Sequence, residues 1–170
     1  MNWTQRCAAV VPCLNEGQSI GAVVRGLKLH LDAVFVVDDG SGDHTVSAAA
    51  AAGAGVLRHA ANRGKGAALK TGLAAARTAG FAWAAMLDGD GQHKAEDLPR
   101  LLDCAQRTGA ALVVGNRMHS PAPMPWLRRQ VNRWMSRKLS QRSGRWLPDS
   151  QCGFRLVNLA AWTGLRLRAG

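Results

Sequence analysis

Two carboxylates separated by one glycine, Asp88 and Asp90, directly follow the apolar segment 81–87. An unbroken apolar run of this length predicts a buried strand, so both acids are expected at its carboxyl end. Paired carboxylate oxygens suit a hard divalent cation, Mg²⁺ or Mn²⁺, which usually keeps substrate phosphates among its other ligands. The alternative is a polar turn in which the Asp-Gly pair only reverses the chain.

The strand that carries these acids belongs to a regular alternation of strands and helices. The strands read as continuous apolar runs, which is typical of parallel sheets covered by helices on both faces. The predicted strands are 6–12, 33–37, 56–58, 81–87 and 111–114, and the predicted helices are about 20–31, 45–52, 66–79 and 96–107.

Unusual polar residues gather where these strands end. Ligands of parallel α/β sheets bind at the carboxyl ends of the strands. We therefore expect one functional site at this edge of the sheet, built from Pro12 to Glu16, Asp38 and Asp39, Asp88 and Asp90, and Arg117.

The composition indicates an ordinary globular domain. The chain has 170 residues, 47% of them hydrophobic, which is enough for one buried core. No apolar run is long enough to cross a bilayer, and the N-terminus lacks the pattern of a secretion signal, so a cytoplasmic protein is expected. The four cysteines show neither metal-binding spacing nor a disulfide framework and are interpreted as reduced, mostly structural thiols.

The net charge of +11 comes from the second part of the chain. Acids and bases balance up to Asp103, and from Cys104 onward Asp149 is the only acid. The basic segment 126–146 has apolar residues at helical spacing, which predicts an amphipathic helix suited to an anionic membrane surface. A solvated basic face is the alternative. Nucleic acid is disfavoured as a partner because no recognised binding module accompanies the segment.

Two familiar phosphate-binding loops do not occur in this sequence. The dinucleotide fingerprint needs Gly-x-Gly-x-x-Gly after the first strand, where residues 12–16 read Pro-Cys-Leu-Asn-Glu. The Walker loop fails because Gly64-Lys65 is followed by Gly66, and His59 stands where the first glycine belongs. Rossmann-type dehydrogenases and P-loop NTPases are therefore excluded.

Five motifs, in order, carry a resemblance to a known family. They occupy residues 11–16, 36–41, 62–68, 88–93 and 149–155, the last reading Asp-Ser-Gln-Cys-Gly-Phe-Arg. On these motifs the chain resembles family 2 glycosyltransferases of the GT-A fold and is most similar to polyprenyl-phosphate (dolichyl-phosphate) mannosyl- and glucosyltransferases. The resemblance implies a Rossmann-like α/β/α sandwich with a mostly parallel central sheet.

The resemblance also implies roles for individual residues. The donor nucleotide would be bound by Pro12, Asn15, Glu16, Asp38, Asp39, Lys65 and Asp88, and the metal, Mg²⁺ or Mn²⁺, by Asp88, Asp90 and Gln92. His93 is expected to be a loop residue beside the site. The expected catalytic residues are Asp90, Asp149, Arg117 and Arg155, and the acceptor phosphate would be held by Arg117, Arg128, Arg129 and Arg155.

The implied reaction moves a sugar from a GDP-mannose or UDP-glucose type donor to a polyprenyl phosphate, with inversion, at the inner face of the cytoplasmic membrane. A phosphate acceptor is already anionic near neutral pH, so it needs arginines rather than a general base. A hydroxyl acceptor would need a base, and Asp149 is then the best choice because it opens the last motif.

The expected organisation is a nucleotide-sugar-binding core at 1–117 and a basic acceptor and membrane-interface segment at 118–170 of the same domain. The second segment is expected to be shortened, because members of the resembling family continue past the Gly-Phe-Arg motif. Leu14 stands where that family usually has an aromatic residue. One alternative is a truncated module that only binds nucleotide or membrane. A sugar nucleotidyltransferase is disfavoured because its Gly-x-Gly-x-Arg start is missing after the first strand.

Overall fold

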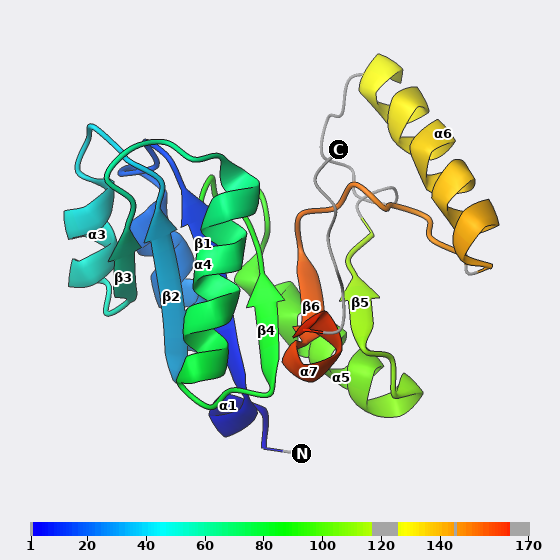
Figure 1. Cartoon of the computed structure of the whole chain (residues 1–170), viewed down its shortest axis with the longest axis horizontal. Helices are drawn as coiled ribbons and strands as arrows, with labels where there is room; N and C mark the ends of the chain where they lie inside the picture. The colour runs from blue at the N-terminus through cyan, green and yellow to red at the C-terminus, as the bar shows by residue number, and fades with distance from the viewer. Residues whose placement is uncertain (1, 117–125, 145, 164–170) are drawn as a thin grey trace.

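The structure, a computed structural model of the chain, describes residues 2–116, 126–144 and 146–163. The strands within these residues are Cys7–Cys13 (β1), Ala33–Asp38 (β2), Gly55–Arg58 (β3), Trp83–Met86 (β4), Leu112–Val114 (β5) and Arg155–Asn158 (β6). They form one sheet in the order β3-β2-β1-β4-β6-β5 (Figure 1). Strands β1 to β4 pair in parallel, whereas β6 runs antiparallel to β4 and to β5.

Helices cover both faces of this sheet. Helices α2 (Ile20–Lys28), α3 (Thr45–Ala51) and α5 (Leu98–Thr108) pack on one face, and α4 (Lys65–Thr78) and α7 (Leu159–Thr163) on the other (Figure 1). The packing of α4 on β1 is close, since a Cβ on Gly72 would lie 2.4 Å from Cγ1 of Val10. The described chain also contains α1 (Trp3–Arg6), the short 3-10 helix η1 (Ala95–Asp97) and α6 (Trp126–Ser143).

The expected α/β/α sandwich with a mostly parallel sheet is confirmed, and the predicted strands and helices are present with slightly shifted ends. The sequence pattern does not predict α1, α7 or β6. Strand β6 is short and begins at an arginine, so it lacks the long apolar run that marks the other central strands. Leu156 nevertheless packs into the core on one face of the sheet, and Val157 into the core on the other. The chain after residue 117 therefore supplies an internal strand of the sheet.

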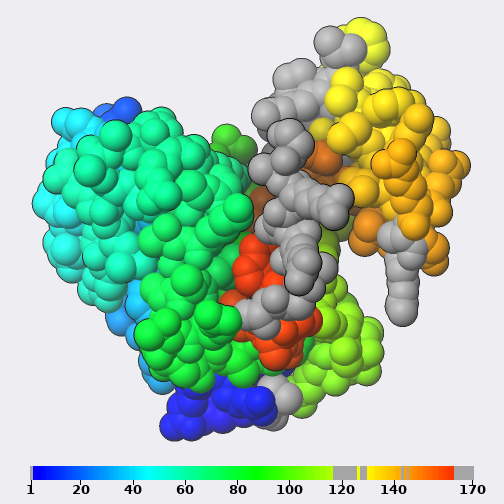
Figure 2. Space-filling model, viewed as in Figure 1, coloured from blue at the N-terminus to red at the C-terminus, as the bar shows by residue number. Residues whose placement is uncertain are grey.

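Helix α6 stands apart from the sandwich, beyond β6 and β5 (Figures 1 and 2). Among the side chains of α6 that the structure describes, the buried ones are Asn132 and Ser136, which lie one turn apart, and the Ser136 hydroxyl accepts a hydrogen bond from the N–H of Ser150 at 2.9 Å. Its apolar stripe is at the predicted spacing but faces outward, with exposed fractions from 37% to 57% for Val131, Trp134, Met135 and Leu139. Neither α6 nor any other described helix has both the length and the apolar character to cross a bilayer.

Candidate active site

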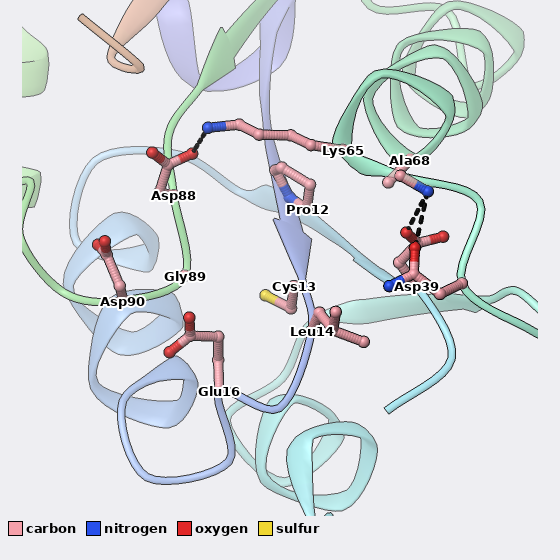
Figure 3. Close-up of a pocket in the computed structure, with 12 residues that line it drawn as sticks. Pro12, Cys13, Leu14, Glu16, Asp39, Lys65, Ala68, Asp88, Gly89 and Asp90 are labelled. Carbon is pink, nitrogen blue, oxygen red and sulfur yellow. Dashed lines mark hydrogen bonds and ion pairs between the residues drawn. The ribbon is translucent and has the colours of Figure 1, made fainter. Parts of the chain in front are cut away.

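A cavity of about 280 Å³ opens at the carboxyl ends of β1, β2 and β4 (Figure 3). Its wall brings together Asp39, Asp88 and Asp90, which follow two different strands. In Figure 3, Asp88 and Asp90 lie on one side with Glu16, and Asp39 lies on the other. The acids at these strand ends therefore share one cleft. The described residues that line it are Pro12, Cys13, Leu14, Glu16, Asp39, Asn62, Gly64, Lys65, Ala68, Asp88, Gly89 and Asp90.

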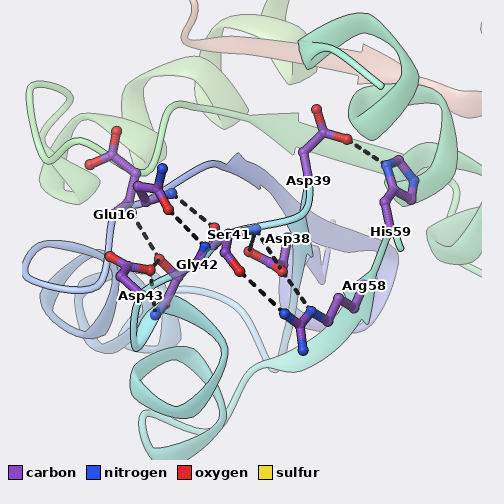
Figure 4. Close-up of polar contacts among 10 residues, drawn as sticks. Glu16, Asp38, Asp39, Ser41, Gly42, Asp43, Arg58 and His59 are labelled. Atoms are coloured by element: carbon purple, nitrogen blue, oxygen red, sulfur yellow. Dashed lines mark hydrogen bonds and ion pairs between the residues drawn. The ribbon is translucent and has the colours of Figure 1, made fainter. Parts of the chain in front are cut away.

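The loop after β1 is held by the loop after β2 (Figure 4). The side-chain oxygens of Ser41 and Thr45 accept hydrogen bonds from the N–H groups of Asn15 and Glu16, each at 2.8 Å. The side-chain oxygen of Asn15 accepts a third from the N–H of Gly42 at 3.0 Å. Of the two predicted nucleotide ligands in this loop, Glu16 lines the cavity, whereas the described contacts of Asn15 connect the two loops.

The first of the two aspartates, Asp38, is the last residue of β2. Asp38 is fully buried, and its Oδ2 is 3.2 Å from Nε of Arg58. It also accepts a hydrogen bond from the N–H of Ser41 (Figure 4). Asp38 is absent from the described lining, so its contacts hold the loop rather than reach into the cavity.

The second aspartate, Asp39, is the one that faces the cavity. Burial alone would raise its pKa, but hydrogen bonds from the His59 ring and from the N–H groups of Arg63 and Gly64 hold the pKa of Asp39 below its ordinary value. Asp39 is therefore a carboxylate at neutral pH and presents a fixed negative charge to the cavity.

A lysine reaches across the cavity to the first acid after β4. Lys65 begins α4, and its Nζ lies 2.5 Å from Oδ1 of Asp88 (Figure 3). Asp90 is exposed, and its Oδ1 accepts a hydrogen bond from the N–H of Gln92 at 2.9 Å. Gln92, a predicted metal ligand, thus orients Asp90 through its backbone, and its side chain is not part of the described lining.

Asp88 and Asp90 fit a divalent cation, although the described residues contain no group of three or more His, Cys, Asp or Glu side chains that could hold a metal ion. Magnesium is commonly bound by one or two carboxylates, with substrate phosphates and water completing its shell. Asp88 already has a cationic partner in the Lys65 ammonium. Phosphate oxygens of a ligand, or water, would complete the shell of a metal at this position.

The reversed direction of β6 brings the last motif against Asp88. Because β6 is antiparallel to β4, it begins at the edge of the sheet where β4 ends. A Cβ on Gly153 would lie 2.7 Å from Oδ2 of Asp88 and 3.2 Å from Nε2 of His93. The backbone of the motif therefore packs directly on the acid. His93 lies beside it, with its ring centroid 5.6 Å from that of Phe154.

The arginine of the motif at residues 149–155 contacts the backbone of the same motif. The Arg155 guanidinium donates to the carbonyl oxygens of Cys152 at 2.8 Å and Ser150 at 3.1 Å, which fixes the turn before β6. Asp149 is only 1% exposed and is not part of the described lining of the cavity. The structure does not describe the side chains of the other predicted acceptor ligands. Arg117 lies outside the described residues, and for Arg128 and Arg129 only the helical backbone is described.

Two contributors to the site carry no motif signal. His59 binds Asp39 from below, and Ser19 places its Oγ 2.7 Å from the carbonyl oxygen of Gly89 and 3.1 Å from Oε2 of Glu16. Ser19 thereby connects the loop after β1 to the loop that carries the two acids after β4. The His59–Asp39 and Ser19–Gly89 contacts join residues 20 and 70 positions apart in the sequence, so only the folded chain reveals them.

Sequence comparisons point to one family. The family model described as Glycosyl transferase family 2 matches residues 8–161. The chain is 28% identical over 173 residues to the UDP-N-acetylglucosamine–dolichyl-phosphate N-acetylglucosaminyltransferase of Methanococcus voltae, covering 89% of this chain and 69% of that protein. It is 33% identical over 167 residues to the undecaprenyl-phosphate mannosyltransferase of Micrococcus luteus, covering 92% of this chain and 64% of that protein.

Solved structures share the fold. The glucosyl-3-phosphoglycerate synthase of Mycobacterium tuberculosis, solved with Mn²⁺, uridine diphosphate and glucosyl-3-phosphoglycerate, matches with a TM-score of 0.73 at 24% identity. The match covers 94% of this chain and 59% of that one, so the chain spans well under two thirds of the length of the solved protein. At this identity the likeness establishes a common architecture.

Proposed function

This chain belongs to glycosyl transferase family 2, and from that premise we propose that it transfers a sugar from a nucleotide-diphosphate sugar to a polyprenyl phosphate, with inversion. The observation that carries the proposal is the single cavity in which Asp39, Lys65, Asp88 and Asp90 meet. The names of both curated relatives specify a long-chain prenyl phosphate, dolichyl or undecaprenyl, which supports this class of acceptor. The donor is of the GDP-mannose or UDP-glucose type.

The two sides of the cavity bind different parts of the donor. Asp39 accepts a hydrogen bond from the nucleoside, and the N-terminus of α4 together with Lys65 supplies positive charge and N–H groups for the diphosphate. Asp88 and Asp90 would hold Mg²⁺ or Mn²⁺; the solved synthase contains Mn²⁺ together with uridine diphosphate. The ion, when bound, supplies positive charge to the departing nucleoside diphosphate.

A phosphate acceptor agrees with the burial of Asp149. A general base must come within hydrogen-bond reach of the proton that it removes, and Asp149 is 1% exposed. A phosphate monoester is mostly dianionic near neutral pH and attacks without a base. We assign Arg117, Arg128, Arg129 and Arg155 to the acceptor phosphate, because arginine forks bind phosphate oxygens well. Attack from the face opposite the leaving group inverts the anomeric carbon.

Helix α6 is assigned to an anionic lipid surface, where a prenyl phosphate resides. Its exposed apolar residues include Trp134 and Leu139, at 57% and 40% exposure. Lys138 lies over the Trp134 ring at 4.9 Å from the centroid, so cationic and apolar groups face solvent together. An interfacial helix combines these two features.

The test is a panel of GDP- and UDP-sugars with Mg²⁺ or Mn²⁺, scored by melting temperature and by product formed on a polyprenyl phosphate. We expect one donor to raise the melting temperature only with metal and to give a glycosyl phosphoprenol. Stabilisation without turnover would favour a module that only binds nucleotide. Absence of stabilisation by every donor would overturn the proposal.

A further inference from the structure

A buried histidine that is not part of the described cavity lining contacts the carboxylate of Asp39. His59 is 7% exposed, and its Nδ1 lies 2.6 Å from Oδ1 of Asp39 (Figure 4). Its Nε2 lies 3.0 Å from Oγ1 of Thr71 on α4. The imidazole therefore connects the strand-end aspartate to the helix that begins with the lysine of the cavity.

The roles of the two ring nitrogens follow from their partners. An ionised carboxylate only accepts hydrogen bonds, so Nδ1 of His59 carries a hydrogen atom and donates the hydrogen bond to Asp39. The other nitrogen lies within hydrogen-bond distance of the Thr71 hydroxyl, which can either donate to it or accept from it, so both ring nitrogens have a partner. These two contacts hold His59 in one ring orientation.

The hydrogen bonds to Asp39 leave little acceptor capacity. Its Oδ1 accepts from His59 and from the N–H of Arg63 at 3.0 Å, and its Oδ2 accepts from the N–H of Gly64 at 2.7 Å. A carboxylate offers about four acceptor sites, so about one remains, on Oδ2. The protein itself uses the other sites, and the carboxylate cannot rotate without breaking these contacts.

We propose that His59 is a positioning residue for nucleoside recognition: it fixes Asp39 so that Oδ2 offers one acceptor site to an N–H or O–H group of the donor nucleoside. This inference rests on the proposed function, in which Asp39 receives the nucleoside. His59 does not touch the ligand and acts through Asp39.

A hydrolytic triad is the other reading of an aspartate, a histidine and a hydroxyl in a row. The orientation of the row argues against it. Asp39 lines the cavity, whereas neither His59 nor Thr71 belongs to the described residues that line it. A nucleophile must face the substrate, but the group of this row that faces the cavity is the carboxylate of Asp39 and not the hydroxyl of Thr71.

Two isosteric substitutions separate positioning from mere structural support. In His59→Asn the side-chain nitrogen replaces Nδ1 and keeps the hydrogen bond to Asp39. In His59→Gln the nitrogen replaces Nε2, which keeps the contact with Thr71 and loses the one with Asp39. Phenylalanine at position 59 keeps the volume and removes both bonds.

The experiment is calorimetric titration of each variant with UDP and GDP in the presence of Mn²⁺, with inorganic pyrophosphate and Mn²⁺ as the nucleoside-free probe. We expect His59→Asn to bind the preferred nucleotide within about threefold of wild type, and His59→Gln and His59→Phe to bind it about tenfold more weakly, since each loses a charge-assisted hydrogen bond. Pyrophosphate affinity should stay unchanged in all three variants.

Each contrary result has a distinct meaning. Equal nucleotide affinity in wild type and His59→Gln would overturn the role of His59, as would a parallel loss of nucleotide and pyrophosphate affinity, which indicates general damage to the site. If wild type binds neither UDP nor GDP, the proposed function itself is wrong. Thr71→Val is the matched control on the far side of the ring, and it should weaken nucleotide binding less than His59→Gln.

Discussion

The Nζ atom of Lys65 lies 2.5 Å from Oδ1 of Asp88, so a cation of the protein already neutralises the acid that we assign to the metal. The two residues come from different motifs, Lys65 from the start of α4 and Asp88 from the loop after β4, and both line the cavity (Figure 3). A divalent ion that bound Asp88 through Oδ1 would displace this ammonium. Lys65 would then be available to a diphosphate.

Replacing Lys65 with Met should therefore have opposite effects on metal and on nucleotide. Both side chains of the pair are partly exposed, and such pairs contribute less than about 1 kcal/mol, so Mn²⁺ affinity without nucleotide should rise by about two- to fivefold. UDP and GDP affinity should fall, because a diphosphate contact is lost. Manganese binding is followed by electron paramagnetic resonance. Lys70→Met, on the same helix, is the control and should change neither; a weaker Mn²⁺ affinity in Lys65→Met would contradict displacement.

Asp90→Asn tests the metal assignment directly. Asn keeps the size of the side chain but removes the charge that holds a divalent ion, so metal-dependent transfer should drop to background, a loss of roughly a hundredfold or more. The stability should change little, since Asp90 is exposed. Turnover is measured across a range of Mn²⁺ concentrations. Asp103→Asn, at a carboxylate on α5 that is 62% exposed, is the control and should keep full activity. Unchanged turnover in Asp90→Asn would contradict the assignment of Asp90 to the metal.

Gly153→Ala tests the contact between the last motif and Asp88. The added Cβ would lie 2.7 Å from Oδ2 of Asp88, so either the carboxylate or the turn before β6 must move. We expect turnover to fall at least tenfold and the free energy of unfolding to fall by about 1–3 kcal/mol, as overpacking usually costs. The measurements are steady-state kinetics and thermal melting. At Gly42 a Cβ would meet nothing within 4 Å, so Gly42→Ala should leave both unchanged.

The pH dependence of stability should show losses at both extremes. The pKa of Asp39 is lowered despite its burial, and the pKa of Asp43 is lowered mainly by its hydrogen bond with Thr45. The contribution of these two carboxylates to the free energy of unfolding is present above the ordinary aspartate pKa of about 4. It is lost as the pH falls through their pKa values in the folded protein. Burial raises the pKa of Cys7 and Cys13 from 9.0 to about 12, so their contribution is present below about pH 9 and is lost toward pH 12.

Melting temperatures from pH 2 to 11 check these signs. Asp39→Asn should flatten the acid limb, because asparagine does not titrate, and Cys13→Ser should flatten the alkaline limb. A melting temperature that rises as the pH falls below 4 would contradict the acid half of this prediction.

The sequence predicts the sheet and the position of the site because both depend on local patterns. Buried parallel strands are continuous apolar runs, and polar residues after them must lie at one edge. This reasoning places Asp39 and Asp88 in the same cleft before any coordinates are known. It does not predict which of Asp38 and Asp39 faces the cavity, because the two are neighbours at the end of β2 and differ only in the side of the backbone that each side chain takes.

What the sequence does not predict depends on long-range contacts. Strand β6 has two apolar residues and no run, and its place between β4 and β5 is decided by pairing with strands far away in the chain. The approach of Gly153 to Asp88 follows from that pairing. The contact of His59 with Asp39 likewise joins residues that directly follow two different strands, β3 and β2, and a lone histidine carries no pattern that would reveal it.

Helix α6 gives the last prediction, because apolar side chains are exposed on it, whereas the buried side chains described for it, Asn132 and Ser136, are polar. Trp134 and Leu139 are 57% and 40% exposed, so they contribute little to the folding of the chain and are available to a surface. The double substitution Trp134→Ser and Leu139→Ser should weaken binding to phosphatidylglycerol vesicles by about tenfold, because two interfacial side chains are lost. The melting temperature should change little. Binding is measured by co-sedimentation, and added salt should weaken it because basic residues attract the anionic lipid. Leu29→Ser is the control, since Leu29 is 80% exposed but lies just after α2. Equal loss in both variants, or equal binding to phosphatidylcholine vesicles, would rule out α6 as the anionic-lipid contact.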